Sequence, residues 1–140
     1  MSAPAQRLDH VGFVVASIRD VAPGFAESTG TTWSGEIIHD PLQQVNVTFL
    51  RASLPHDPSV ELVEPVGPDS PVVRFLERGG GLHHVCYEVP ILETQLTLSR
   101  SCGGLVVRPP LPAVAFGGRR IAWVYTRQKL LIEFLERSTA

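Results

Sequence analysis

Apolar residues recur along the chain in short blocks, and turns rich in Gly, Pro and Asp separate these blocks. Blocks dominated by β-branched and aromatic residues predict strands, and blocks with helical spacing predict helices. The expected strands cover residues 8–15, 33–38, 45–50, 60–63, 82–89, 105–108, 120–125 and 130–135. The expected helices cover residues 17–30, a short segment before residue 79, and residues 91–101. The order strand, helix, strand, strand, strand therefore occurs twice.

Two prolines bear on where the first two helices begin. Proline is tolerated in the first turn of a helix, where N–H groups lack intrahelical partners. Pro23 therefore predicts a first helix that starts near Asp20. For the short second helix, Ser70 is the expected N-cap and Pro71 the first helical residue.

The two halves of the pattern also match residue by residue. Residues 8–15 align with 82–89, so that His84 follows His10 at an offset of 74. Residues 60–64 align with 132–136, so that Glu133 follows Glu61 at an offset of 72. Two matches in order at nearly equal offsets indicate a tandem duplication. We expect one domain with a first module of about 8–65, a linker with a short helix at 66–80, and a second module of about 81–137.

Each half places one imidazole and one carboxylate on the same side of its strands. Side chains alternate faces along a strand, so the histidines and glutamates point away from the apolar neighbours that meet the helix. If a pseudo-twofold axis relates the halves, His10, Glu61, His84 and Glu133 can converge. Two buried carboxylates repel, and a divalent cation removes that cost. His and Glu together suit Zn, Ni, Co, Mn or Fe and do not select among them.

Each of these residues also has an ordinary structural interpretation. A single histidine in a strand is more often a satisfied structural residue than a ligand, and a single strand glutamate is usually solvated. The pairing in both halves favours metal ligation. His83 should face away, because the alignment with His10 selects His84, and Cys86 is expected to fill space. Glu64 and Glu136 also repeat with the opposite parity, which predicts solvated carboxylates at strand ends.

Composition narrows the functional class. The 140 residues are 44% hydrophobic and 19% charged, with a net charge of −2, which gives no electrostatic case for nucleic acid or an anionic membrane. No apolar run approaches the ~20 residues of a membrane span. The two cysteines form no CxxC pair, which favours a cytoplasmic compartment.

Arg119 and Arg120 follow a Gly-Gly turn and could bind a phosphate or carboxylate. They could equally be charged residues that protect an exposed strand edge from pairing with another chain.

With these residues assembled, the chain resembles the vicinal oxygen chelate superfamily, and within it the methylmalonyl-CoA epimerase-like branch. The similarity covers Leu8 to Glu136. The motifs that carry it are Leu-Asp-His-Val-Gly at 8–12, Val-Glu-Leu at 60–62, Gly-Leu-His-His-Val at 81–85 and Leu-Ile-Glu at 131–133. The resemblance implies an α+β fold of two tandem βαβββ modules, which form a cupped, mostly antiparallel sheet around one divalent metal ion.

It further implies a metal-dependent enzyme that moves a proton α to a carbonyl, with an acyl-CoA thioester as a candidate substrate. By analogy with mobile metal-bound glutamates of the superfamily, Glu133 is the expected proton carrier. Arg119 and Arg120 are the expected substrate-binding residues, near the phosphates. A homodimer is expected on the same basis. No second acid is evident, because residues 43–48 offer no carboxylate.

Three alternatives use the same fold. A glyoxalase I-type isomerase or lyase would act on a thiol adduct with the same His/Glu pairs. A non-catalytic drug-binding protein of the bleomycin-resistance type would bind its ligand in the same cavity, although such proteins usually lack the paired ligands. An extradiol dioxygenase is disfavoured, because a site of two histidines and one glutamate leaves Glu61 unexplained.

Overall fold

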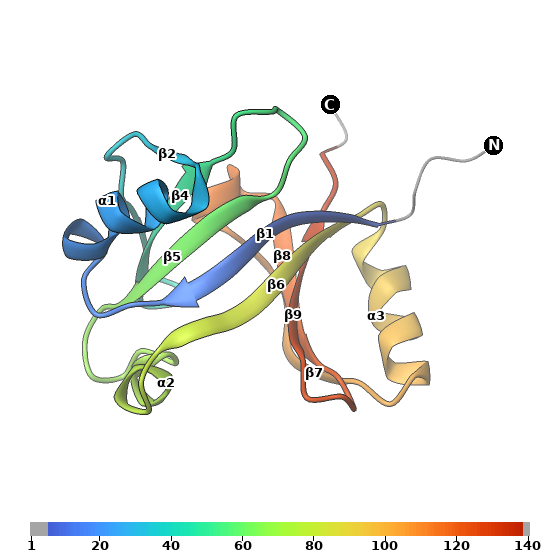
Figure 1. The fold of residues 1–140 in the computed structure, drawn as a ribbon. Helices are drawn as coiled ribbons and strands as arrows, with labels where there is room; N and C mark the ends of the chain where they lie inside the picture. The colour runs from blue at the N-terminus through green and yellow to red at the C-terminus, as the bar shows by residue number, and fades with distance from the viewer. Residues whose placement is uncertain (1–5, 139–140) are drawn as a thin grey trace. The chain divides into compact units, whose positions relative to one another are not determined.

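The computed structural model describes residues 6–138 and contains the two expected repeats (Figure 1). The first repeat comprises β1 (Arg7–Val14), α1 (Ile18–Thr29), β2 (Thr32–Trp33), β3 (Ile38–Asp40), β4 (Val45–Arg51) and β5 (Ser59–Pro65). The helix α2 (Val73–Glu77) follows it. The second repeat comprises β6 (Gly81–Val89), α3 (Leu92–Ser101), β7 (Leu105–Pro112), a 3-10 turn at Val114–Phe116, β8 (Arg120–Tyr125) and β9 (Leu131–Glu136).

Contacts divide the chain into two compact units. The N-terminal unit is residues 10–83, and the C-terminal unit contains residues 84–138 together with the start of β1 up to Asp9. In the N-terminal unit β1 pairs with β5 in parallel, β5 pairs antiparallel with β4, and both β2 and β3 pair antiparallel with β4. In the C-terminal unit β6 pairs with β9 in parallel, and β9–β8 and β8–β7 are antiparallel. The predicted α+β class with mostly antiparallel pairing is confirmed.

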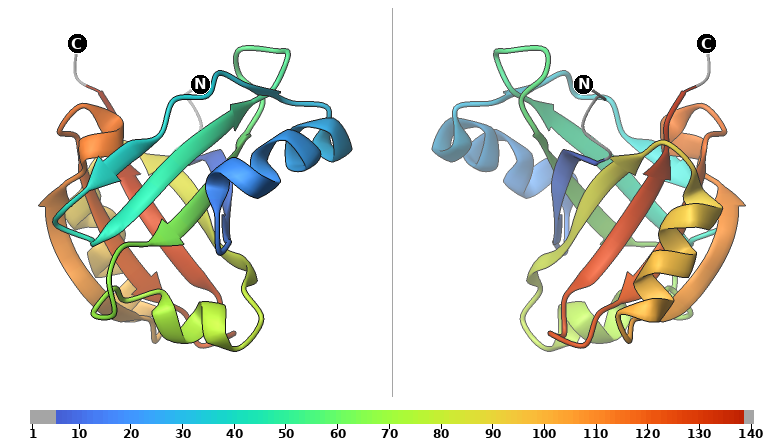
Figure 2. Two further views of the ribbon diagram at one scale, coloured as in Figure 1. Left: turned by 90° about the vertical axis from the view of Figure 1, so that its left-hand side faces the viewer. Right: turned by 90° about the vertical axis from the view of Figure 1, so that its right-hand side faces the viewer.

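Each unit buries one face of its strands under one helix (Figure 2). In the N-terminal unit, Ile18 and Ala22 of α1 pack with Leu50 and Leu62 of the sheet. In the C-terminal unit, the core contains Leu92 and Leu96 of α3 with Val89, Ala122, Val124 and Phe134. The apolar face of each strand is thereby fixed toward its helix. Because side chains alternate, the polar residues between them must point to the opposite face.

The first helix agrees with the expected span of 17–30, but the start near Asp20 that Pro23 favoured is wrong. The helix covers Ile18–Thr29, so Pro23 lies beyond the first turn. Ser17 is the N-cap, and its hydroxyl accepts a hydrogen bond from the backbone N–H of Asp20 at 3.3 Å. The Glu64 carboxylate accepts a second bond from the Ile18 N–H at 2.8 Å. These two acceptors stabilise the helix start, and they outweigh the one backbone bond that Pro23 cannot make.

Two other boundaries also differ. The second helix begins at Val73, and Ser70 caps nothing with its side chain; its carbonyl accepts a bond from the Val73 N–H at 3.2 Å. The expected strand at 33–38 is two short strands, β2 and β3, which pair with different parts of β4. No helix within residues 6–138 combines the length and apolar character that a transmembrane helix requires.

Candidate functional site

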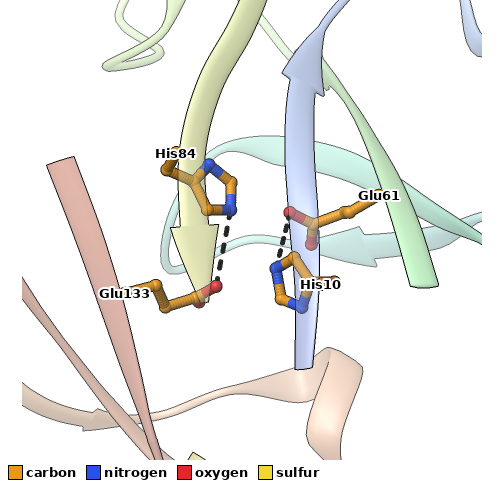
Figure 3. Close-up of side chains that lie close together, drawn as sticks. All are labelled: His10, Glu61, His84 and Glu133. Carbon is orange, nitrogen blue, oxygen red and sulfur yellow. Dashed lines mark ion pairs between the residues drawn. The ribbon is translucent and has the colours of Figure 1, made fainter. Parts of the chain in front are cut away.

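The N-terminal unit holds the first histidine–glutamate pair on neighbouring strands. His10 lies on β1 and Glu61 on β5, and the parallel register places Glu61 opposite Gly12, two residues beyond the histidine. Nε2 of His10 lies 3.3 Å from Oε1 of Glu61 (Figure 3). The two side chains are 0% and 7% exposed. The pair is therefore buried on the face of the sheet that α1 does not cover.

The C-terminal unit repeats this arrangement. Glu133 of β9 lies opposite Cys86 of β6, again two residues beyond the histidine, His84. Nε2 of His84 lies 3.5 Å from Oε1 of Glu133, and the side chains are 2% and 4% exposed. The parallel pairing of the first and last strand of each repeat explains the match. It brings together two residues that are about 50 positions apart in the chain and puts both on one face.

An aromatic residue that the sequence analysis did not single out packs against each imidazole. Phe49 of β4 meets His10 edge to face, with ring centroids 5.5 Å apart, and lies opposite Glu61 in the register. Trp123 of β8 meets His84 with centroids 4.7 Å apart and lies opposite Glu133. Trp123 follows Phe49 at the same offset of 74 that relates the histidines. Extending the repeat alignment to these strands could have found both residues.

The donor set of each pair suits a divalent ion. An imidazole nitrogen and a carboxylate oxygen about 3.3–3.5 Å apart can both contact one ion through bonds of about 2.1 Å. A buried carboxylate is costly unless a cation or hydrogen bonds compensate it. The edge-to-face aromatic rings restrict imidazole rotation and make the surroundings less polar. All four residues are buried and of types that ligate metals, so the residues present fit the metal that the resemblance implies.

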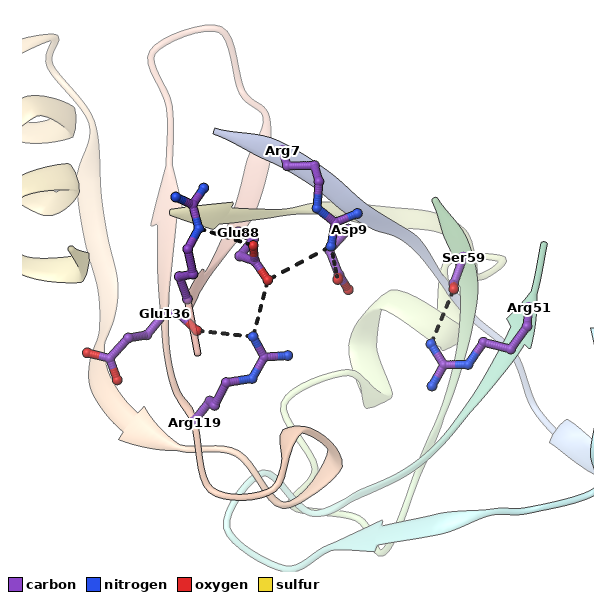
Figure 4. A network of polar contacts seen from close by, with 8 residues as sticks. Arg7, Asp9, Arg51, Ser59, Glu88, Arg119 and Glu136 are labelled. Carbon is purple, nitrogen blue, oxygen red and sulfur yellow. Dashed lines mark hydrogen bonds and ion pairs between the residues drawn. The ribbon is translucent and has the colours of Figure 1, made fainter. Parts of the chain in front are cut away.

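The structure separates the two arginines that were expected to bind substrate. Arg119 lies on the face that carries His84 and Glu133, where its Nη1 contacts the Glu88 carboxylate at 3.2 Å (Figure 4). Arg120 contacts Glu136 at 2.6 Å and Glu93 of α3 at 2.7 Å. It therefore lies on the opposite, helix-covered face. Of the two, only Arg119 shares a face with the His84–Glu133 pair.

Glu64 and Glu136 are bound rather than solvated, so the expectation for these two strand-end carboxylates is wrong. Glu64 accepts hydrogen bonds from the Ile18 N–H and from the Asn46 side-chain amide at 3.0 Å. Hydrogen bonds from Arg120 hold the pKa of Glu136 below its ordinary range. Both glutamates attach a helix to the sheet and do not belong to the metal site.

The expectations for His83 and Cys86 agree with the structure. His83 turns toward α2, where its ring meets Phe75 edge to face at 4.8 Å. Cys86 is fully buried among Ala113, Ile121 and Leu135. The histidine selected by the alignment with His10 is thus the one on the buried polar face, and Cys86 fills space beside it.

Comparison with known proteins identifies the family of this chain. The family model described as the Glyoxalase/Bleomycin resistance protein/Dioxygenase superfamily matches residues 9–123. The chain belongs to this superfamily. The resemblance drawn from the sequence motifs is confirmed, and so is the vicinal oxygen chelate fold.

Individual relatives have similar lengths. An uncharacterized protein of Bacillus subtilis, YqjC, is 36% identical over 135 residues, which are 93% of this chain and 91% of that protein. The ethylmalonyl-CoA/methylmalonyl-CoA epimerase of Cereibacter sphaeroides is 28% identical over 86% of this chain and 89% of its own. The crystal structure of methylmalonyl-CoA epimerase from Mycobacterium tuberculosis has a TM-score of 0.81 at 22% identity, with 99% of this chain and 93% of that chain covered. Epimerases of acyl-CoA esters are thus among the proteins most similar to this chain.

Proposed function

We propose that this protein is a divalent-metal-dependent isomerase that moves a proton α to the carbonyl of an acyl-CoA thioester. The observation that carries the proposal is the repeated buried pair, His10 with Glu61 and His84 with Glu133, at the same register in each repeat. In this proposal the two pairs together bind one ion. Two neutral imidazoles and two carboxylates balance its charge of +2.

The substrate class follows from the relatives. The Cereibacter sphaeroides protein is named for ethylmalonyl-CoA and methylmalonyl-CoA, and we extend the acyl-CoA class to this chain. Such substrates carry an acidic C–H bond next to the thioester carbonyl. When bound, the ion supplies positive charge close to the carbonyl oxygen, where negative charge develops as the proton leaves.

Glu133 is the proposed proton carrier. Its carboxylate is buried, and its neighbours His84 and Trp123 restrict its position. A carboxylate in such a position can accept a proton from the substrate carbon and return it. His10, Glu61 and His84 hold the ion together with Glu133 in this scheme. Arg119 lies on the same face as Glu133 for contact with the anionic part of the substrate.

Metal analysis tests the first part of the proposal. Protein purified without chelator should contain about one divalent ion per chain by mass spectrometry. His84→Ala should lower this content at least tenfold. His83→Ala is the matched control, because His83 contacts Phe75 and should leave the content unchanged. Equal metal content in the His84→Ala variant and the wild type would remove the metal site from the proposal.

Isotope exchange tests the reaction. Candidate acyl-CoA esters are incubated with metal-loaded protein in deuterated water, and mass spectrometry follows deuterium incorporation at the α carbon. We expect incorporation for at least one branched dicarboxylic acyl-CoA. Metal-loaded protein that exchanges none of the panel would contradict the proposed reaction.

One feature favours a second candidate, a glyoxalase I-type isomerase acting on a thiol adduct. Both repeats supply glutamate, which gives a carboxylate on each side of the proposed ion. Turnover of a hemithioacetal without α-hydrogen exchange in acyl-CoA esters would select this candidate. A protein that retains no metal and binds a ligand without turnover would instead match the drug-binding members. The homodimer stays a prediction, which analytical ultracentrifugation can test.

A further inference from the structure

Three arginines surround one glutamate in the C-terminal unit (Figure 4). The carboxylate of Glu88 on β6 lies 3.2 Å from Nη1 of Arg119 and 3.3 Å from Nε of Arg137. Nη2 of Arg7 lies 3.8 Å from the same carboxylate and 3.4 Å from Asp9. The three guanidinium groups come from β1, from the turn before β8 and from the segment after β9. Residues far apart in the chain therefore place positive charge around one point.

The arginine cluster is defined as Arg7, Arg119 and Arg137 around Glu88. Its three guanidinium groups gather at one carboxylate, and Arg7 also contacts Asp9. Glu88 has 16% of its side chain exposed, whereas Arg7, Arg119 and Arg137 have 41%, 30% and 36% exposed. The Glu88 carboxylate thus lies beneath the three guanidinium groups, which are partly exposed to solvent. A guanidinium has five N–H donors, and each contacts Glu88 through one nitrogen.

Glu88 also restricts where the guanidinium groups can be. A free arginine side chain loses rotamer entropy when it binds an anion. A carboxylate that already holds three arginines lowers that loss. Arg119 is further restricted by Phe116, whose ring centroid lies 5.7 Å from its Cζ, and by its bond to the Glu136 carbonyl at 3.3 Å. Restricted, partly exposed guanidinium groups are suited to a phosphate, which accepts several charge-assisted bonds at once.

We propose that the arginine cluster binds a phosphate group, with Glu88 as the residue that positions the arginines. The inference rests on the proposed function in one respect, which is that an acyl-CoA supplies such a phosphate. Glu88 follows His84 by four residues on the same face of β6, about 13 Å at 3.3 Å per residue. The arm that joins the thioester to the pyrophosphate of an acyl-CoA contains two amides and flanking carbons, and spans roughly 15 Å when extended. A phosphate at the cluster is thus compatible with a thioester near His84.

Calorimetric titration with inorganic pyrophosphate tests the site directly. Arg119→Gln and Arg137→Gln should each weaken binding about tenfold, the loss expected for one charge-assisted contact. Arg100→Gln removes the same charge from the exposed end of α3, outside the cluster, and should change binding less than twofold. Equal losses in the Arg119→Gln and Arg100→Gln variants would overturn the proposal, because general charge would then explain the binding. So would the absence of pyrophosphate binding in the wild type.

The His84→Ala variant separates this site from the metal centre. It should lose metal and exchange activity and yet bind pyrophosphate within twofold of the wild type. Loss of pyrophosphate binding in this variant would place the anion on the metal and overturn the inference. The wild type could also bind pyrophosphate in a manner that depends on Arg119 and yet catalyse no α-hydrogen exchange. That result would contradict the proposed reaction and support the phosphate site.

Coenzyme A and pantetheine distinguish a site for the phosphates of an acyl-CoA from a site for a free phosphate compound. Titration with coenzyme A and with pantetheine, which lacks phosphate, is repeated for Arg119→Gln. A tenfold loss for coenzyme A and none for pantetheine supports a site for the phosphates of the substrate. Retained pyrophosphate binding that does not compete with coenzyme A supports a site for a free phosphate compound. An equal loss for coenzyme A and pantetheine contradicts phosphate binding at the cluster.

Discussion

The two repeats attach their helices to equivalent strands by different chemistry. In the N-terminal unit, the strand-end carboxylate of Glu64 accepts a hydrogen bond directly from the first N–H of α1. In the C-terminal unit, the equivalent Glu136 binds Arg120, and Arg120 binds Glu93 in the first turn of α3. The first helix has a side-chain N-cap at Ser17, and α3 begins after Ile91 without one. The carboxylate keeps its position while its partner changes.

The histidine–glutamate pair on the opposite face differs less between the repeats. The histidine and glutamate are identical, and their register is the same. The residue opposite the glutamate changes from Gly12 to Cys86, and the aromatic neighbour changes from Phe49 to Trp123. The next residue on this face of the first strand changes from Val14 to Glu88. A helix attachment needs only some stabilising contact, whereas the proposed shared ion would constrain the type and position of the donor in each repeat. The two faces of each sheet therefore differ in how closely the repeats match.

Substitution of the two glutamates of the site should change the rate of α-hydrogen exchange by very different factors. Glutamine keeps the size and one oxygen donor of glutamate and cannot accept a proton. We therefore expect Glu133→Gln to lower the rate of α-hydrogen exchange by about 10²–10⁴-fold. Glu61→Gln should lower it by less than about tenfold if its role is metal binding alone. The rates are measured at equal metal occupancy, and equal losses in the two variants would contradict the assignment of the proton to Glu133.

Equivalent core residues provide the next comparison. Leu62 of β5 and Phe134 of β9 each pack beneath the helix of their unit. We expect Leu62→Ala to lower the free energy of unfolding by about 2–5 kcal/mol and Phe134→Ala by about 3–5 kcal/mol. Urea titration followed by circular dichroism measures both. A loss below 1 kcal/mol in either variant would show that its site is not packed as described.

The two helix attachments should differ in strength. Glu64→Ala removes a bond to a helix N-terminus and leaves the Ile18 N–H without this acceptor, which should cost about 1–2 kcal/mol. Glu136→Ala removes a partly exposed ion pair and should cost about 0.5 kcal/mol. Glu27→Ala on the exposed side of α1 is the control and should be close to neutral. Urea titration of the three variants tests the order, and a larger loss for Glu136→Ala would reverse the comparison.

Lowering the pH should weaken the contacts of Arg120 with Glu136 and Glu93, with a small effect on the free energy of unfolding. Hydrogen bonds from Arg120 lower the pKa of Glu136, and also that of Glu93. A carboxylate whose pKa is lower in the folded state stabilises the fold above its ordinary pKa, about 4.3, and this contribution is lost as pH falls through the lower value. Between pH 5 and 3 the unfolding free energy should therefore fall slightly more steeply in the wild type than in Arg120→Gln. Parallel curves would contradict this contribution.

Much of this fold could be predicted from the pattern of residues. The repeated strand and helix order, the parity that separates His84 from His83, and the match of Glu61 with Glu133 all follow from local spacing. The start of α1 was mispredicted because its stabilising acceptor, Glu64, lies 46 residues away in the sequence. The solvated state expected for Glu136 failed for the same reason, since Arg120 becomes its partner only when β8 pairs with β9.

Residue spacing along the chain was enough to predict the duplication and the residue types of the candidate metal site. Alternation along a strand is a local property, and the same local signal appears twice. Three features required the folded chain: Phe49 and Trp123 pack on the imidazoles, Arg119 and Arg120 lie on opposite faces, and three arginines gather at Glu88. These contacts join side chains from strands that are distant in the chain. Such pairings depend on strand register and on the path of the turns, which residue spacing alone does not encode.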